Sequence, residues 1–390
     1  LDNPGEERPG GGVIGAVGEV TLAQGAVTSK LFRSSDFANS LVTGISAPAP
    51  LDQTLFHGKP WELSDSNWSP DFPTAAAQAA RFYQAATGES VDGVIGVDPV
   101  ALGYVLAVTG PVSVPPYPQT VDAQNALLEL NEIINKARPG DPGKVYLAPF
   151  GDAVTTRVLS APLGEDPDIA AALLRAAQGK HLVLDFNDPT LMAAADGAGF
   201  TGRISDPLSD MLQVVDANVG ANKADLFVTR SYSLDATVSD NGEVADTLTL
   251  TYHNPAQTDP ALQSLVSQFG GAYHDYVRAY VPESASLQSM KVQAGSGPVT
   301  SVSPSSIDYE LQREAIGFLL VVPPGQTVTL TLTYAGPFAD ASSQPVQYAM
   351  SWGKEIGAPA WPVQLTVHID GRQQAFSTTL DGDRTWSLSG

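Results

Sequence analysis

The chain has 390 residues, a formal net charge of −22 and no cysteine. The charge argues strongly against a nucleic-acid partner, which needs a basic face, and against broad electrostatic docking on anionic lipid. The lack of cysteine excludes disulfides, thiolate catalysis and cysteine-ligated metals.

Hydrophobic residues make up 43% and charged residues 16% of the chain, which is typical of a globular protein long enough for two or three domains. The cysteine-free composition fits a bacterial cell-surface protein, so we expect an extracytoplasmic location in the cell envelope. No stretch reaches the roughly 18 apolar residues of a membrane span, and no signal peptide opens the chain. Because the chain starts abruptly at Leu1, we expect a membrane anchor upstream.

Residues 1–217 alternate predicted strands and helices. Periodicity and turn signals predict strands at 13–22, 26–33, 91–97, 181–186 and 212–217, and helices at 74–87, 98–110, 123–137, 166–178 and 188–195. Asp98 before Pro99 is typical of a helix N-cap. A buried strand that leads directly into this helix indicates an α/β layer, so we expect an α/β domain over residues 1–217.

From residue 224 the pattern changes to runs of Val, Thr, Tyr and Leu separated by turn residues. Strands are predicted at 226–238, 246–253, 276–281, 287–294, 315–322, 327–334, 347–352 and 363–369. Strands at this spacing predict a β-sandwich domain over residues 218–390. A short helix is expected to interrupt it at 260–269.

The most distinctive stretch is residues 3–15, with five glycines, two glutamates and one arginine. Glycine lets the main chain approach a ligand closely. Backbone amides at Gly11 and Gly12, with Arg8 beside them, could therefore hold an oxyanion such as phosphate. The alternative is a flexible N-terminal leader.

Arg8 precedes the first predicted hairpin and Arg33 ends it, so the chain can return to bring the two guanidinium groups together. Two close arginines repel each other unless an anion or carboxylates lie between them. Glu6 and Asp36 are candidates for those carboxylates, or for ligands of a divalent cation that also binds a substrate phosphate. The alternative is a surface salt-bridge network worth about 0–1 kcal/mol.

A second polar cluster lies about sixty residues later, at Asn67, Trp68 and Asp71. An exposed tryptophan beside amide and carboxylate groups suits sugar stacking with hydrogen bonding. The alternative is an aromatic plug under a loop, with Asp71 capping the next helix. A carboxylate pair facing a sugar would also support glycoside hydrolysis, which we keep as a minor hypothesis.

Several catalytic motifs are absent from the sequence. The five histidines show no metal-ligand spacing, and neither a G-x-S-x-G elbow nor a G-x-x-x-x-G-K-[ST] loop occurs. Residues 216–223 are expected to form a loop crossing between the domains, with Asn218, Asn222 and Lys223 as weaker polar candidates.

Several motifs in order resemble the bacterial family catalogued as domain of unknown function 4012. They are Asn3-x-x-Glu6-x-Arg8-x-x-Gly11-Gly12, Trp68-Ser-Pro-Asp-Phe-Pro73, Asp92-Gly-Val-Ile-x-Val-Asp-Pro99, Thr109-Gly-Pro-Val112, Asn218-x-Gly220-x-Asn222-Lys223 and Tyr276-x-Arg278-x-Tyr280-Val-Pro282. The resemblance spans nearly the whole chain.

Residues 92–114 also resemble, more distantly, the LytR-CpsA-Psr family, whose members transfer glycopolymers from a polyprenyl pyrophosphate carrier to the cell wall. The resemblance implies a mixed sheet with helices, with arginines holding the pyrophosphate and acidic residues holding magnesium. It places Arg8 and Arg33 as the phosphate grip and Asp36, with Glu6, as magnesium ligands.

Two main hypotheses follow. The first is a magnesium-dependent phosphotransferase acting on a polyprenyl-pyrophosphate-linked glycopolymer, with Arg8, Arg33 and Asp36 catalytic and with Glu6, Gly11, Gly12, Asn67, Trp68 and Asp71 binding substrate. The second is a non-catalytic cell-surface module that binds glycan, such as cell-wall polysaccharide, or lipid, because the chain lacks the arginine-rich pattern of active transferases. Metal-dependent turnover distinguishes them.

Overall fold

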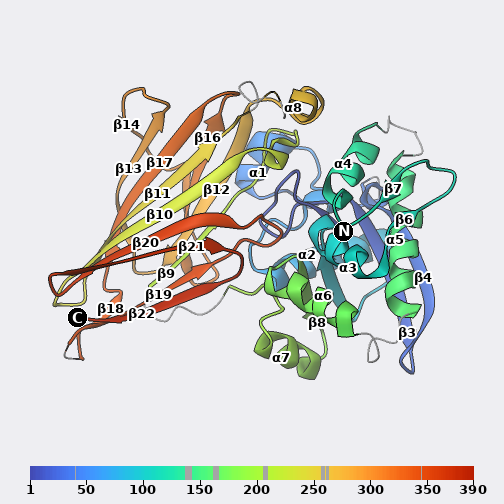
Figure 1. Cartoon of the computed structure of the whole chain (residues 1–390), viewed down its shortest axis with the longest axis horizontal. Coiled ribbons are helices and arrows are strands. Elements are labelled where there is room, and N and C mark those ends of the chain that lie inside the picture. The colour runs from blue at the N-terminus through green and yellow to red at the C-terminus, as the bar shows by residue number, and fades with distance from the viewer. Residues whose placement is uncertain are drawn as a thin grey trace. The chain divides into compact units, whose positions relative to one another are not determined.

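The structure, a computed structural model, describes residues 1–39, 41–136, 143–160, 167–204, 210–255, 260, 263–343 and 345–390. It divides into two compact units (Figure 1). The first unit comprises Leu1–Arg203 with Ile356–Ala358, and the second comprises Ile204–Glu355 with Pro359–Gly390. Among the described residues, no helix combines the length and the apolar character needed to cross a membrane.

Within the described part of the first unit, strands pair two at a time and always antiparallel. The pairs are β1 (Asp2–Asn3) with β2 (Val13–Ile14), β3 (Ala16–Ala23) with β4 (Ala26–Ser34), β5 (Gly93–Val97) with β8 (Leu182–Phe186), and β6 (Val112–Ser113) with β7 (Thr120–Val121). The predicted N-terminal hairpin is confirmed as β3 and β4. The larger mixed sheet of the LytR-CpsA-Psr resemblance is not formed, because β5 and β8 gain no further strand neighbour among the described strands.

The strand predicted at 91–97 was expected to be buried, and this is wrong for β5. Gly96 and Val183 lie against the ring of Phe72 at the start of a helix, whereas Ile95 is 57% exposed. Neighbouring residues of a strand point to opposite faces, so the face that carries Ile95 does not share this packing.

Helices supply most of the first unit. They are α1 (Ala49–Leu51), α2 (Phe72–Thr87), α3 (Pro99–Thr109), α4 (Ala126–Lys136), α5 (Gly143–Ser160), α6 (Pro167–Gln178) and α7 (Pro189–Gly197), with 3-10 turns at Ser35–Ala38 and Leu63–Asp65 and a π-helical turn at Asp52–Phe56. The five predicted helices are present, although Ala137 and Asp166 lie outside the described residues. Asp71, Asp98 and Asp188 each accept hydrogen bonds at the N-terminus of the helix they precede.

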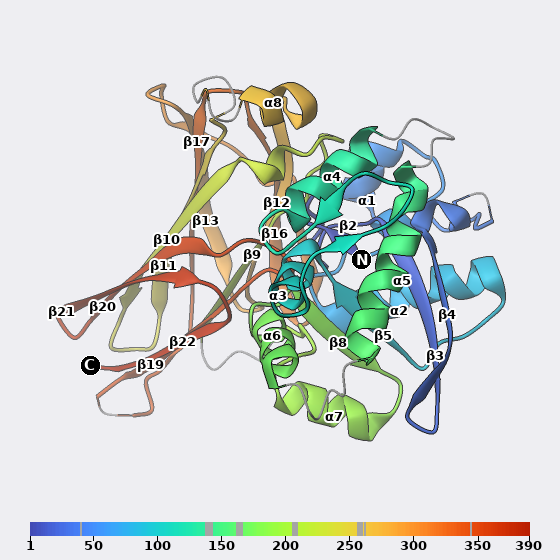
Figure 2. The ribbon, with the colours of Figure 1, turned by 45° about the vertical axis from the view of Figure 1, so that its right-hand side comes forward.

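Helix α5 was not predicted, although it carries much of the core of the first unit. Tyr146, Leu147, Phe150 and Val154 are buried and pack with residues of α3 and α4. The hairpin β3–β4 lies beside α5 (Figure 2), and Lys30 of β4 forms an ion pair with Asp152 at 2.7 Å.

The second unit contains two seven-stranded sheets. The first has the order β14 (Thr300–Ser301), β13 (Ser286–Ala294), β17 (Thr327–Gly336), β11 (Val244–His253), β10 (Thr229–Val238), β20 (Trp361–Ile369), β21 (Arg372–Leu380). The second has the order β15 (Ser306–Glu310), β16 (Arg313–Val322), β12 (Tyr273–Pro282), β9 (Asp210–Val215), β19 (Gln347–Gly353), β18 (Ala339–Asp340), with β22 (Arg384–Ser389) also paired to β19. The helix α8 (Gln263–Phe269) and a 3-10 turn at Ala224–Leu226 complete the unit.

One hydrophobic core joins the two sheets. It includes Leu250 and Leu332 of the first sheet and Val277, Leu320 and Met350 of the second. Inward side chains alternate with outward ones along β11 and β17, as two packed sheets require. All eight strands predicted after residue 224 are confirmed, whereas β14, β15, β18, β21 and β22 were not predicted.

The boundary expected between residues 217 and 218 lies inside the second unit. The reason is β9, which pairs antiparallel with β12 and parallel with β19. Residues 210–215 are therefore part of a sheet whose other strands lie far along the chain, and the division falls at Arg203 and Ile204 instead.

Two carboxyl groups lie among the residues of this core. Asp246 of β11 is fully buried opposite Tyr334, and within the described part of the chain neither of its carboxyl oxygens accepts a hydrogen bond. Asp210 accepts a hydrogen bond from the Tyr348 hydroxyl at 2.6 Å. Burial raises the pKa of Asp210 to about 7, and burial, reinforced by the charge of Asp210, raises the pKa of Asp246 well above its ordinary value.

We expect Asp246→Asn to flatten the pH dependence of stability. A carboxyl group whose pKa is raised by folding keeps its proton in the folded state, so its contribution is complete below the unfolded pKa of about 4 and is lost as pH rises through the folded pKa. The free energy of unfolding of the wild type should therefore fall between pH 5 and pH 8, by up to about 1.4 kcal/mol per pH unit for each such proton. Urea unfolding at pH 5, 6.5 and 8 measures this.

The exposed Asp240→Asn serves as the control and should keep the wild-type slope. At pH 8 the Asp246→Asn protein should be the more stable one, by on the order of 1–3 kcal/mol, because it folds without the proton uptake that the wild-type carboxyl group requires. An unchanged slope in Asp246→Asn would contradict this account.

Candidate functional site

The glycine-rich stretch of the first unit folds back on its own backbone. The amides of Gly11 and Gly12 donate to the carbonyl of Arg8, at 2.9 and 3.0 Å, and the amide of Val13 donates to the carbonyl of Glu6 at 3.0 Å. The amide of Gly10 donates to the carbonyl of Asn67 at 3.0 Å. The amides predicted to hold an oxyanion are thus engaged within the fold.

The glycines are required by the close approach of the chain to itself. Gly12 has a φ of +109°, and a Cβ at this position would lie 2.3 Å from the carbonyl oxygen of Asn3. A Cβ on Gly10 would lie 2.8 Å from Asn67. Burial beside this turn raises the pKa of the Asp2 carboxyl to about 7.

Arg8 lies inside this turn and is 2% exposed. Its Nε and Nη2 atoms contact Asp65 Oδ1 at 2.8 and 2.7 Å, and its Nη1 donates to the carbonyl of Glu7 at 2.8 Å. Glu6 Oε1 lies 3.7 Å from Arg8 Nη2, so the expected pairing of Arg8 with Glu6 is present. Asp65 was not predicted, because nothing in its local sequence sets it apart from the other aspartates of the segment.

Arg33 pairs with a different carboxylate. Its Nη2 lies 4.0 Å from Glu19 Oε2, and its guanidinium lies 4.5 Å from the ring centre of Phe37. Glu19 also accepts a hydrogen bond from the Tyr83 hydroxyl of α2. The side chain of Arg33 remains 32% exposed, and Asp36 follows it in the 3-10 turn, where its amide bonds Ser34 Oγ at 3.3 Å.

The cluster at residues 67–71 joins the N-terminal turn. Asn67 Nδ2 donates to the carbonyl of Gly12 at 2.6 Å, so the two polar clusters seen in the sequence form one assembly. Asp71 Oδ2 accepts hydrogen bonds from Thr74 and caps α2. The exposed tryptophan that sugar stacking requires is not present, because the Trp68 side chain is 7% exposed. This burial fits the alternative of an aromatic plug, with Asp71 as the helix cap.

A buried aspartate–histidine pair was missed by sequence reasoning. Asp98 Oδ1 accepts hydrogen bonds from the amides of Val100 and Ala101, which confirms the predicted N-cap. Its second oxygen lies 2.6 Å from His181 Nδ1. An aspartate that fixes one imidazole nitrogen orients the ring, and here the pair ties the start of α3 to the residue before β8. Nothing in the sequence around His181 indicates that it pairs with Asp98, which lies 83 residues earlier in the chain.

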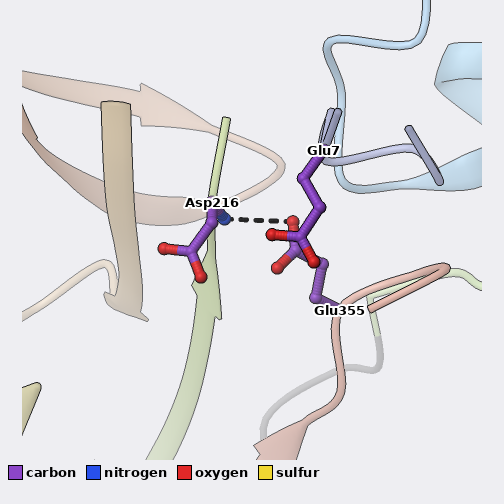
Figure 3. A group of neighbouring side chains, drawn as sticks. All are labelled: Glu7, Asp216 and Glu355. Carbon is purple, nitrogen blue, oxygen red and sulfur yellow. Dashed lines mark hydrogen bonds between the residues drawn. The ribbon is translucent and has the colours of Figure 1, made fainter. Parts of the chain in front are cut away.

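The second unit contains a larger buried polar network around Asp216, the residue after β9. The amide of Asp216 donates to Glu355 Oε1 at 3.0 Å (Figure 3). Its carboxylate accepts hydrogen bonds from the hydroxyls of Tyr252 at 2.7 Å and Tyr232 at 2.9 Å. Arg230 Nε lies 2.9 Å from Asp216 Oδ2. All of these side chains are buried.

The loop after Asp216 completes this network. Arg230 Nη2 lies 2.6 Å from Asp225 Oδ1, and Asn218 Nδ2 donates to Asp225 Oδ2 at 2.7 Å. Asn222 accepts from the amide of Ala224 at 3.1 Å. Asn218 and Asn222 therefore hold the loop together, and the expectation that residues 216–223 cross between domains is wrong because the loop lies within the second unit.

Two carboxyl groups of this network are biased toward the protonated form. Asp275 Oδ1 accepts from the amide of Ala217 at 2.8 Å, and burial together with the neighbouring Asp216 carboxylate raises the pKa of Asp275 well above its ordinary value. Burial and the same Asp216 charge raise the pKa of Glu355. Sequence reasoning missed Asp216, Asp275 and Glu355, whose neighbours come from distant strands.

We expect Gly12→Ala to destabilise the protein by more than about 4 kcal/mol, because the new Cβ meets the backbone of residue 3 at an unfavourable φ. Gly25→Ala is the matched control: it also has a positive φ, of +79°, but has no atom within 4 Å. The control should cost only about 1–2 kcal/mol. Thermal and urea unfolding measure the stability of both variants. An equal loss of unfolding free energy in the two variants would contradict the steric explanation.

Comparisons with solved structures give only weak similarity. A Legionella pneumophila protein with an attributed nutrient-binding role aligns at 12% identity and a TM-score of 0.26, over 41% of this chain and 55% of that one. An M1 zinc metallopeptidase of Deinococcus radiodurans aligns at 14% identity and a TM-score of 0.20, over 40% of each chain. The alignments thus span about half or less of those proteins, and no inference about fold or function follows from similarity at this level.

A search of curated proteins finds no match. The resemblance of residues 92–114 to the LytR-CpsA-Psr family stays a prediction. Residues 1–133 match the model of the family described as Protein of unknown function (DUF4012), a match that supports the first resemblance and covers the N-terminal turn, Arg8, Arg33 and the segment 67–71.

Proposed function

We propose that the chain is an extracytoplasmic cell-envelope protein whose first unit is a non-catalytic recognition module for a polyprenyl-linked glycan. The observation that supports the non-catalytic assignment is that the Arg8 side chain is buried and already paired with carboxylates. This guanidinium is buried, contacts Asp65 with two nitrogens and has Glu6 nearby. A cation already neutralised by two carboxylates attracts a pyrophosphate poorly.

The proposed recognition surface is the tip of the hairpin β3–β4. Residues 20–29 carry no charged side chain in a chain of net charge −22. Val20 and Leu22 are exposed, Leu22 by 61%, and they lie on the same face of β3 because residues two apart in a strand point the same way. Exposed aliphatic side chains gathered on one element are typical of a binding surface for an apolar partner, and the prenyl chain of a lipid-linked glycan has that chemistry.

A second candidate is the magnesium-dependent phosphotransferase. It is favoured by Arg33, whose side chain is one third exposed beside the turn that holds Asp36. In this version Arg33 would bind the pyrophosphate and Asp36 and Glu6 would hold magnesium. A hydroxyl of the acceptor glycan would attack the phosphorus that carries the glycopolymer, and the P–O–P bond would break to release polyprenyl monophosphate. Glycosidase action on envelope polysaccharide stays a third, minor prediction.

Native mass spectrometry with a short polyprenyl alcohol and the matching polyprenyl pyrophosphate, with and without magnesium, tests the two candidates. We expect both lipids to bind alike, because the prenyl chain is what is recognised, and we expect no phosphate release. Val20→Asp combined with Leu22→Asp should remove binding, since burying two charges against a prenyl chain is costly. Binding that requires the pyrophosphate, is lost in Arg33→Ala and proceeds to phosphate release with magnesium would favour the phosphotransferase instead.

A pair of variants tests the role of Arg8 directly. Arg8→Ala should cost about 3–5 kcal/mol of stability, because it leaves the Asp65 carboxylate buried without its partner, while polyprenyl pyrophosphate binding by the folded fraction is unchanged. Arg33→Ala, at a partly exposed pair, should cost about 0–1 kcal/mol. Urea unfolding and mass spectrometry measure both quantities.

Asp65→Asn distinguishes the two roles of Arg8 further. If Arg8 is a structural tie, removing its partner destabilises the protein and leaves lipid binding as it was. If Arg8 grips phosphate, freeing the guanidinium should strengthen pyrophosphate binding and Arg8→Ala should abolish it, which would overturn the non-catalytic proposal.

A further inference from the structure

One long strand edge of the second unit has no pairing partner among the described strands. The first sheet ends at β21, whose nine residues pair with β20 on one side, and no described strand pairs with the other side. In an antiparallel pair about half of the backbone N–H and C=O groups of a strand point away from its neighbour. Those groups of β21 are therefore a template for hydrogen bonding to a further strand.

Two other ends of the sheets carry protection that β21 lacks. β14, at the opposite end of the first sheet, has two residues, and β15, which ends the second sheet, carries Asp308 and Glu310 among its five. Short edge strands and charged edge side chains discourage pairing with another chain. β21 is long, contains no proline, and carries its one charged residue, Arg372, at its first position.

An aromatic side chain of β21 lies at the rim of the core. Phe376 is opposite Leu365, a core residue of β20, and its ring centre lies 6.3 Å from that of Trp386 on β22. Both rings pack against the core but are only partly buried. A strand added beside β21 would cover the apolar surface that Phe376 leaves exposed.

We propose that β21 pairs antiparallel with β21 of a second copy of this chain, across a two-fold axis, so that the two first sheets become one. A two-fold axis perpendicular to a sheet places one residue opposite its own copy. Phe376 is the middle residue of β21, so an axis at Phe376 pairs the strand along its whole length. The contact is the same on both copies and closes after two, so it covers both edges.

This register places compatible residues opposite each other. Ala375 lies opposite Ser377 of the second copy, and Arg372 lies opposite Leu380 of the second copy. Like charges, which destabilise a strand pair when they are directly opposite, therefore do not meet. The two copies of Phe376 face each other, and aromatic pairs stabilise neighbouring antiparallel strands. The fit of β21 to its own copy favours self-association over an unrelated partner.

The net charge of −22 on each chain opposes this contact at long range. Salt screens repulsion between exposed charges, so we expect the dimer to strengthen as the ionic strength rises from about 0.01 to about 0.15 M. Pairing of one strand edge makes a small interface, and we expect a dissociation constant in the micromolar range.

Sedimentation equilibrium of the full chain over a range of protein concentrations tests the proposal. The monomer has a mass of 40.7 kDa, and the dimer has twice that mass. Hydrogen exchange gives a second readout that locates the contact. The amides of β21 should exchange more slowly as the protein concentration rises, because pairing protects those that face away from β20.

Double substitutions at Ala375 and Ser377 test the register. Ala375→Glu with Ser377→Glu, and Ala375→Lys with Ser377→Lys, each place like charges opposite each other and should weaken the dimer at least about tenfold. Ala375→Lys with Ser377→Glu places opposite charges there and should dimerise at least as tightly as the wild type. All three should fold, because both positions are exposed and lie opposite the uncharged Thr366 and Gln364 of β20.

A control variant adds the same charge away from the edge. Thr229→Glu with Ser231→Glu changes two exposed residues of β10, a strand that has neighbours on both sides. This variant should dimerise as the wild type does. Thermal unfolding of each variant confirms that the chain is folded.

Two results would overturn the proposal. The first is a monomer at every concentration and ionic strength, which would leave the edge to an extended segment of another protein. The second is a dimer that the paired glutamates and the paired lysines leave as strong as the wild type, which would place the contact on another surface.

Discussion

The neutralisation of buried charge is the constraint on which both units depend. An acidic chain that buries many carboxyl groups must pair each negative charge with a cation or keep the group protonated, because an uncompensated buried charge costs several kcal/mol. The first unit does so with Arg8 against Asp65. The second does so with Arg230, which contacts Asp216 and Asp225. With only 20 lysines and arginines available, cations placed in this way are committed to the fold.

The N-terminal motif has the residue types of a phosphate site, but its arginine and its glycine amides are bonded within the fold. Glycines, an arginine and acidic residues are what a phosphate site needs, and they are equally what a tight, self-bonded turn needs. Here the amides of Gly11 and Gly12 bond the carbonyl of Arg8, and the Arg8 side chain bonds Asp65. Residue types in a motif therefore indicate which chemistry is available, whereas the hydrogen-bond partners decide whether the fold has already used it.

Local features of the fold were predictable from the sequence, and features that depend on distant residues were not. The hairpin β3–β4, the caps at Asp71 and Asp98 and the eight strands after residue 224 rest on short-range patterns. Helix α5 was missed because Pro149 interrupts its pattern, although the buried spacing of Tyr146, Leu147, Phe150 and Val154 is helical. The pairing of β9 with β12 and β19 could not be predicted from the residues around β9, because both partner strands lie far along the chain. For Trp68 the local sequence allowed both an exposed and a buried side chain, and only the three-dimensional packing decides for the buried one.

The short segment Ile356–Ala358 has a consequence for how the protein is made. It belongs to the first unit although second-unit residues flank it on both sides: Ile356 bridges Gly10 and packs with Phe72, and the amide of Gly357 donates to the carbonyl of Lys180 at 3.0 Å. A ribosome that has released residue 203 has therefore not yet supplied all of the first unit. Its folding during synthesis has to wait for about 150 further residues, and a gene cut between the two units would leave the first without part of its core.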